Sequence, residues 1–139
     1  MHQQHETITC NTHGTGLYEI TGAVSSFVSI SGINDGLLTL LVQHTSASLT
    51  IQENADPDVR DDLIDALDRL APQSRNLYRH TAEGLDDMPA HIKTALTDTS
   101  LSIPIMAGVM RLGTWQGIYL AEHRIHPHTR CIAAHIIGL

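Results

Sequence analysis

The residues best suited to chemistry fall in four short segments, and the first is HTSAS at residues 44–48, directly after an apolar run. Residues just past a strand are held by a rigid scaffold, so an imidazole and hydroxyls placed there can reach a ligand. The hydroxyls of Thr45, Ser46 and Ser48 are therefore candidates to hydrogen-bond phosphate oxygens. The alternative is an ordinary Ser/Thr-rich turn with a half-exposed His44.

The second segment is ENADPD at residues 53–58, which leads into a predicted helix. Asp56 followed by Pro57 is typical of an N-cap and a first helical position. If Asp56 serves the cap, Glu53 and Asp58 remain as candidates for a metal ligand or a general base. The alternative is that these acids only stabilise the positive end of the helix.

The third segment, HTAEGLDDMPAHIK at residues 80–93, holds two histidines, a glutamate and two aspartates. That many ionisable groups in a loop and a first helical turn indicate more than a connector. His91 near the start of its helix can point back toward the loop that carries His80. With His44 this makes three imidazoles, the set that a catalytic zinc site uses while one position stays open. The alternative is a solvated loop and a capped helix.

The fourth group of candidates lies in the C-terminal third, where LGTWQG at residues 112–117 precedes a predicted strand. Trp115 can fill the core at the entry to this strand, but the adjacent Gln116 is polar and needs either solvent or a hydrogen-bond partner. Glu122 and Arg124 share one face of the strand, since side chains alternate with a period of two. Either Arg124 or Arg130 can bind a phosphate through two parallel hydrogen bonds.

The elements that must position these side chains alternate irregularly along the chain. Apolar periodicity and turn residues predict strands at 6–10, 17–20, 37–42, 49–51, 101–106, 117–122 and 131–137, and helices beginning near Thr21, Pro57 and Met88. The first two strands are expected to pair across a turn at 14–16, and the run 37–42 to be buried on both faces. Strands, helices and strands without a regular alternation predict one α+β domain over residues 1–139.

Composition narrows the possible partners. The formal net charge is −7, with 8 Lys and Arg against 15 Asp and Glu, and no basic stripe, which argues against nucleic acid. A small phosphorylated metabolite held by one or two cations remains compatible with that charge. No apolar run reaches the roughly 18 residues of a membrane helix, and the first residues lack the features of a secretory signal. A cytoplasmic protein without membrane contact, with Cys10 and Cys131 as reduced thiols, is expected.

Three stretches, taken in order, closely resemble the family named for secondary thiamine-phosphate synthase activity. They are QHTSASLTIQENADPDVRDDL (43–63), YRHTAEGLDDMPAHIK (78–93) and SIPIMAGVMRLGTWQGIYLAEHRIHPHTR (102–130), about half of the chain. The resemblance implies an α+β subunit with two packed β-layers and flanking helices, assembling as a homotrimer. It also implies a polar pocket built from the motif residues.

Residue by residue, the resemblance implies that His44, His80 and His91 bind a divalent metal, zinc or else magnesium. It implies acid–base or supporting groups at Glu53, Asp58, Glu83 and Asp87. It implies pocket-lining or bracing groups at Gln116, Glu122 and Arg130, of which Glu122 is also a catalytic candidate. Lys93 is expected to contact the substrate.

The implied activity joins a hydroxymethylpyrimidine pyrophosphate to a thiazole phosphate and releases pyrophosphate. A metal and an arginine would neutralise the leaving pyrophosphate while a cation develops on the pyrimidine methylene. Two alternatives stay open from the residues themselves. One is a metal-dependent hydrolase of a phosphorylated substrate that uses the same histidines, and the other is a non-catalytic, metabolite-binding trimer.

Overall fold

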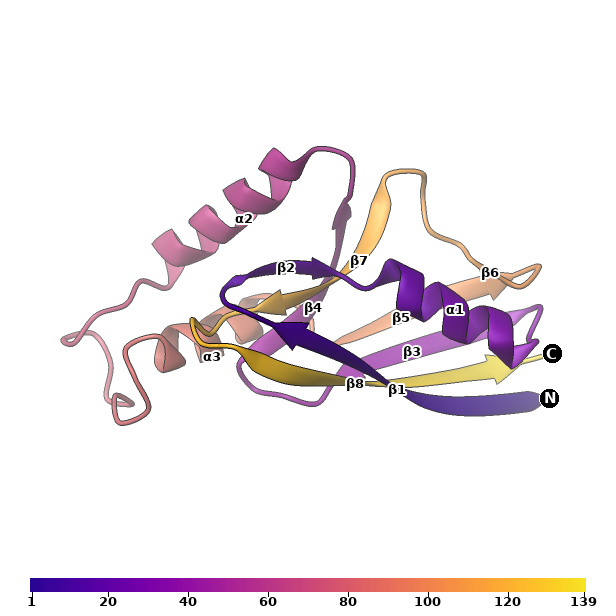
Figure 1. Cartoon of the computed structure of the whole chain (residues 1–139), viewed down its shortest axis with the longest axis horizontal. Coiled ribbons are helices and arrows are strands. Elements are labelled where there is room, and N and C mark those ends of the chain that lie inside the picture. Colours follow the sequence, from indigo (N-terminus) through magenta and orange to yellow (C-terminus); the bar gives the residue numbers. More distant parts are fainter.

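The structure, a computed structural model, describes the whole chain from Met1 to Leu139. Its elements are, in chain order, β1 (His2–Thr12), β2 (Gly16–Glu19), α1 (Thr21–Ser31), β3 (Gly36–Val42), β4 (Ala47–Glu53), α2 (Pro57–Leu70), α3 (Asp87–Leu96), β5 (Ser100–Met106), β6 (Val109–Met110), β7 (Gln116–Glu122) and β8 (His128–Gly138). Figure 1 shows α2 and α3 in the middle of the sequence, between two sets of strands. This order confirms the predicted α+β class.

The strands form two antiparallel sheets. The larger has five strands in the order β1-β8-β3-β5-β6, and the smaller has three in the order β2-β7-β4. β1 and β8 pair along their full length, with His2 opposite Gly138, so the two chain termini lie side by side (Figure 1). The predicted arrangement of two β-layers with flanking helices is therefore confirmed.

The core lies between the two sheets and under α1. Leu38, Leu40 and Val42 of β3 are buried and face this core, while Leu37 and Leu41 point to the outer face and are exposed. The prediction that residues 37–42 are buried on both faces is therefore wrong. Only the inner face of the larger sheet is covered, so its strands alternate in burial with a period of two.

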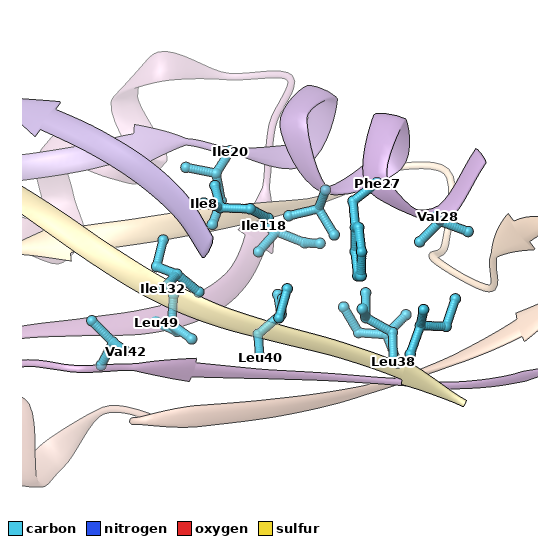
Figure 2. Close-up of a cluster of buried hydrophobic side chains, with 14 of the residues drawn as sticks. Ile8, Ile20, Phe27, Val28, Leu38, Leu40, Val42, Leu49, Ile118 and Ile132 are labelled. Carbon is cyan, nitrogen blue, oxygen red and sulfur yellow. The ribbon is translucent and has the colours of Figure 1, made fainter. Parts of the chain in front are cut away.

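Helix α1 and the smaller sheet close the core from the other side. Phe27 and Val28 of α1 extend toward β3, and Ile118 of β7 and Leu49 of β4 complete the cluster (Figure 2). Aliphatic side chains make up most of this cluster, as the low aromatic content requires. Burial of such side chains is the main favourable term in folding, at about 25 cal/mol per Å² of apolar surface.

Two local predictions at the start of the chain are corrected. β1 and β2 do not pair with each other, because β1 pairs with β8 while β2 pairs with β7 in the other sheet. Gly14, with φ 141°, turns the chain from one sheet to the other. Thr21 is not the N-cap of α1 but its first residue, and Ile20 occupies the cap position. The Thr21 hydroxyl instead donates to Glu19 and accepts from the Ile118 amide.

Helix α2 begins as predicted. The Asp56 side chain accepts from the Asp58 amide at 2.9 Å, and Pro57 occupies the first turn. Leu63 and Leu67 of α2 face the outer side of the smaller sheet across a cavity of about 250 Å³, and no residue of this helix is fully buried. None of the three helices is both long enough and apolar enough to span a membrane.

Candidate metal centre

Two histidines and an aspartate converge at the entrance to α3. His80 comes from the loop before the helix, and Asp87 and His91 lie four residues apart, hence on one helix face. His80 Nε2 is 2.6 Å from Asp87 Oδ2, and His91 Nε2 is 3.2 Å from the same oxygen. One ligand atom from each residue lies within 4.8 Å of the others, so the three can hold a metal ion.

The orientation of His91 is fixed from a distant segment. Its Nδ1 donates to the Thr45 carbonyl at 3.0 Å, in the loop after β3. A proton committed to Nδ1 leaves the Nε2 lone pair available to a metal, which is the usual way in which a carbonyl orients a metal-binding histidine. The segment 44–48 was predicted to reach a ligand through its hydroxyls, and the Thr45 carbonyl contact to His91 was not foreseen from the sequence. The Thr45 side chain itself is exposed.

The Asp87 carboxylate is held from its other side by Arg124. Arg124 Nη1 donates to Asp87 Oδ1 at 2.8 Å, and its Nε donates to Asp86 Oδ2 at 2.9 Å. Burial would raise the pKa of Asp87, but the hydrogen bond from His80 and the charge of Arg124 hold that pKa below its usual value. The carboxylate is therefore ionised, with Oδ2 directed at both histidines, as a metal ligand requires.

The donor set suits a catalytic metal position. Two imidazole nitrogens and one carboxylate oxygen are one of the three-ligand sets found in catalytic zinc sites, and they leave a fourth position open. Metal–ligand bonds of about 2.0–2.2 Å place tetrahedral ligands roughly 3.3 Å apart. The His91–Asp87 pair is already near that separation, whereas His80 and Asp87, at 2.6 Å, would move apart by less than about 1 Å on metal binding.

His44, the third imidazole of the predicted zinc set, lies outside this group. Its Nε2 accepts a hydrogen bond from the Cys131 amide at 2.8 Å, so that lone pair is already in use. Burial and the nearby Arg130 charge lower the pKa of His44, which keeps the ring neutral. Asp87, predicted as an acid–base or supporting group, takes the place of the third imidazole in the convergent set.

Glu122 and Arg130, predicted to line or brace a pocket, form a closed ion pair. Glu122 is 0% exposed and Arg130 4%, with Arg130 Nε 2.7 Å from one carboxylate oxygen and Nη2 2.9 Å from the other. Arg130 Nη2 also donates to Ser46 Oγ at 3.0 Å. The polar groups of Glu122, Arg130 and Ser46 are therefore hydrogen-bonded to one another inside the chain. This geometry supports the bracing role.

Ser48 and Lys93, predicted to contact substrate, are also buried among protein groups. Ser48 Oγ lies 2.8 Å from His123 Nε2 and accepts from Thr97 Oγ1 at 2.6 Å. Lys93 Nζ is paired with Asp68 Oδ1 at 2.5 Å. His123 was not selected from the sequence, because a histidine at a strand end gives no signal that its ring faces inward.

Three of the predicted site residues lie at the far end of the smaller sheet. Glu53 pairs with Gln116 there, whereas the opposite end of the same seven-residue β4 pairs with Glu122 near the histidines. At about 3.3 Å per residue, the two ends are roughly 20 Å apart. Gln116 accepts from the Gly113 amide, and Asp58 is exposed at the start of α2. Within one subunit, these three residues are therefore not brought to His80, Asp87 and His91, which we call the His80 group.

Buried His123 predicts a loss of stability in acid. Burial and the charges of Lys93 and Arg130, only partly opposed by Asp68, lower the pKa of His123 from 6.5 to about 4. The unfolded chain therefore binds the proton first, and about 3 kcal/mol of stability is lost as the pH falls from 6.5 toward 4. Urea unfolding across that range should show a shallower pH dependence for His123→Gln than for the parent protein.

The matched control for this acid effect is His2→Gln on the exposed start of β1. That variant should keep the full pH dependence of the parent. Equal pH dependence in His123→Gln and the parent protein would show that His123 does not carry the effect.

The fold and the site together define a class of protein. It is a single-domain α+β protein of two antiparallel sheets, with a His/Asp/His group at one end that can hold a metal ion. The chain belongs to the YjbQ-like UPF0047 family, whose model matches residues 6–139. The match includes the first strands, which the three sequence motifs did not reach. The family description names no reaction.

Relatives in several bacteria agree with this assignment. The chain is 50% identical to the UPF0047 protein sll1880 of Synechocystis over 136 residues, covering 98% of this chain and 92% of that protein. It is 45% identical to YjbQ of Escherichia coli O157:H7 over 134 residues, covering 96% of each. A crystal structure of a YjbQ/UPF0047 family protein from Clostridium acetobutylicum is 37% identical, covers 95% of this chain and 99% of that one, and superposes with a TM-score of 0.87.

Proposed function

We propose that this protein is a metal-dependent enzyme that acts on a small phosphorylated metabolite. The observation that carries the proposal is the convergence of His80 Nε2, His91 Nε2 and Asp87 Oδ2, with His91 Nδ1 committed to a carbonyl. A histidine fixed in the metal-binding tautomer and an ionised, clamped carboxylate are more than a solvated loop requires. A homotrimer, as the motif resemblance implies, is part of the proposal.

The reaction proposed is thiamine-phosphate synthesis, on the strength of the motif resemblance. A divalent cation bound by His80, Asp87 and His91 would supply positive charge to the oxygens of the leaving pyrophosphate. Arg124 binds Oδ1 of Asp87, so that Oδ2 faces the Nε2 atoms of His80 and His91, where the cation would be held. The bond between the pyrimidine methylene carbon and a pyrophosphate oxygen breaks, and the electron pair leaves with the pyrophosphate. The ring nitrogen of the thiazole phosphate supplies the electron pair of the new bond to that carbon.

A metal-dependent hydrolase is the second candidate, and one observation favours it. The Glu83 side chain is 66% exposed, and its Oε2 lies 3.9 Å from His80 Nε2. A carboxylate so close to the proposed ligands, and in no tight ion pair, can serve as a general base for water. Turnover of simple phosphoesters without the two thiamine precursors would select this candidate.

Metal content and turnover test the proposal together. The parent protein should contain about one zinc or similar ion per chain, and His91→Ala should lose both the ion and at least about 100-fold in turnover of the two precursors. Elemental analysis and a product assay give the two readouts. His126→Ala removes an exposed histidine outside the group and should change neither.

Two outcomes of that experiment would contradict the proposal. One is a parent protein that binds no metal after loading, and the other is a His91→Ala variant with full activity. His44→Ala separates the two ligand sets. Retention of the metal in that variant supports the His/Asp/His set, and its loss supports the three-imidazole set predicted from the sequence.

A further inference from the structure

Both arginines that the sequence offered as phosphate ligands are engaged inside the protein. Arg124 binds Asp86 and Asp87, and Arg130 binds Glu122. Neither arginine is therefore available to a phosphorylated substrate, so any side-chain cation that assists the proposed metal ion has to come from elsewhere in the chain. Arg75 and Arg79, in the loop that leads to His80, are both exposed and form no ion pair within the chain, and of the two only Arg75 lines a cavity.

Arg75 lines a cavity next to the proposed metal centre. The cavity has a volume of about 360 Å³ and is formed by Arg75, Thr81, Gly84 and Leu85. That volume falls in the range of small-molecule sites. Thr81 directly follows His80, and its hydroxyl has no partner in the chain, so it can donate to a ligand oxygen.

Gly84, which lines this cavity, lies close to the Asp86–Arg124 ion pair. Its φ is 108°, which favours glycine, and a Cβ there would lie 3.0 Å from Asp86 Oδ1. Glu83, the preceding residue, accepts from Arg124 Nη2 at 2.9 Å through its carbonyl. The guanidinium that holds Asp87 therefore also fixes the backbone of the cavity wall, and the two sites form one structural unit.

We infer that this cavity is the subsite for the phosphate or pyrophosphate group of the substrate, with Arg75 and Thr81 as its ligands. The inference rests on the proposed function and deepens it. The planar Arg75 guanidinium can bind two anion oxygens at once. Of the acidic groups nearby, Asp86 and Asp87 share the Arg124 guanidinium, whereas the exposed Glu83 carboxylate has no arginine partner, so Arg75 has to outweigh its repulsion of an anion. Leu85, partly exposed at the edge, provides an apolar contact for the organic part of the substrate.

Binding of inorganic pyrophosphate tests this subsite. Titration calorimetry on chelator-treated and metal-loaded protein should detect binding in both. Arg75→Gln should raise the dissociation constant about 10- to 100-fold in each state, the loss expected for hydrogen bonds from a charged group. Arg111→Gln is the matched control, since Arg111 is also exposed but lies after β6, and it should change the constant less than about twofold.

The outcomes separate this inference from the proposed function. Undiminished pyrophosphate binding in Arg75→Gln, an equal loss in Arg111→Gln, or no binding to the parent protein would each overturn the subsite. Failure of the proposed function has another signature, namely no metal and no turnover while Arg75-dependent pyrophosphate binding persists. Metal content should be unchanged in Arg75→Gln, which shows that the anion loss is not secondary to loss of the ion.

Discussion

Replacing Arg130 with methionine is expected to lower the free energy of unfolding by about 3–5 kcal/mol. The substitution leaves the Glu122 carboxylate, which is 0% exposed, without the guanidinium that neutralises it. The His128 ring lies 3.2 Å from Glu122, but its Nδ1 already donates to the His126 carbonyl at 2.7 Å. No other charged donor is therefore placed to replace Arg130, and the uncompensated buried charge determines the loss.

The double variant Glu122→Met with Arg130→Met is the control for this effect. Removing both charges removes the desolvation penalty as well, so most of the lost stability should return. Urea unfolding at neutral pH measures all three proteins under one condition. A double variant less stable than Arg130→Met would show that the pair itself, rather than the unpaired carboxylate, carries the stability.

Local signals in the sequence predicted the positions of helices and strands better than they predicted which strands pair with each other. The Asp56-Pro57 cap and the turn residues around 32–36 placed α2 and β3 correctly because these signals act within a few residues. The pairing of β1 with β2 was wrong because the turn at 14–16 is a local cue, whereas β8 is contributed from the opposite end of the chain. Sequence periodicity carries no information on which distant strand pairs with a given strand.

The candidate site was predictable in its density of ionisable groups but not in its geometry. The segment 80–93 did supply His80, Asp87 and His91. The Thr45 carbonyl and Arg124 that orient them come from other segments, so spacing along the chain did not predict them.

Two of the side chains offered as substrate ligands, Arg130 and Ser48, contact other protein groups instead. The Arg130–Glu122 and Ser48–His123 contacts are buried. A polar residue at a strand end has the same sequence signature whether it faces a ligand or a buried partner.

Asp87→Asn is expected to weaken divalent-metal binding by at least about 100-fold and to reduce turnover by a similar factor. The amide keeps the shape of the side chain but removes the negative charge that both histidines face. A neutral oxygen is a much poorer ligand for a divalent cation than a carboxylate. Competition with a metal-binding dye measures the affinity, and the product assay measures turnover.

Asp86→Asn is the matched control, because it makes the same change on the adjacent residue. Asp86 also binds Arg124, and its Oδ2 accepts from the Ile125 amide at 2.9 Å, but the residue is not part of the convergent set with the histidines. That variant should lose stability while it retains the metal. Equal loss of metal in both variants would mean that Asp87 acts by anchoring Arg124, and parent-like affinity in Asp87→Asn would remove it from the ligand set. Loss of metal confined to Asp87→Asn would identify the carboxylate as the ligand that completes the two-histidine site.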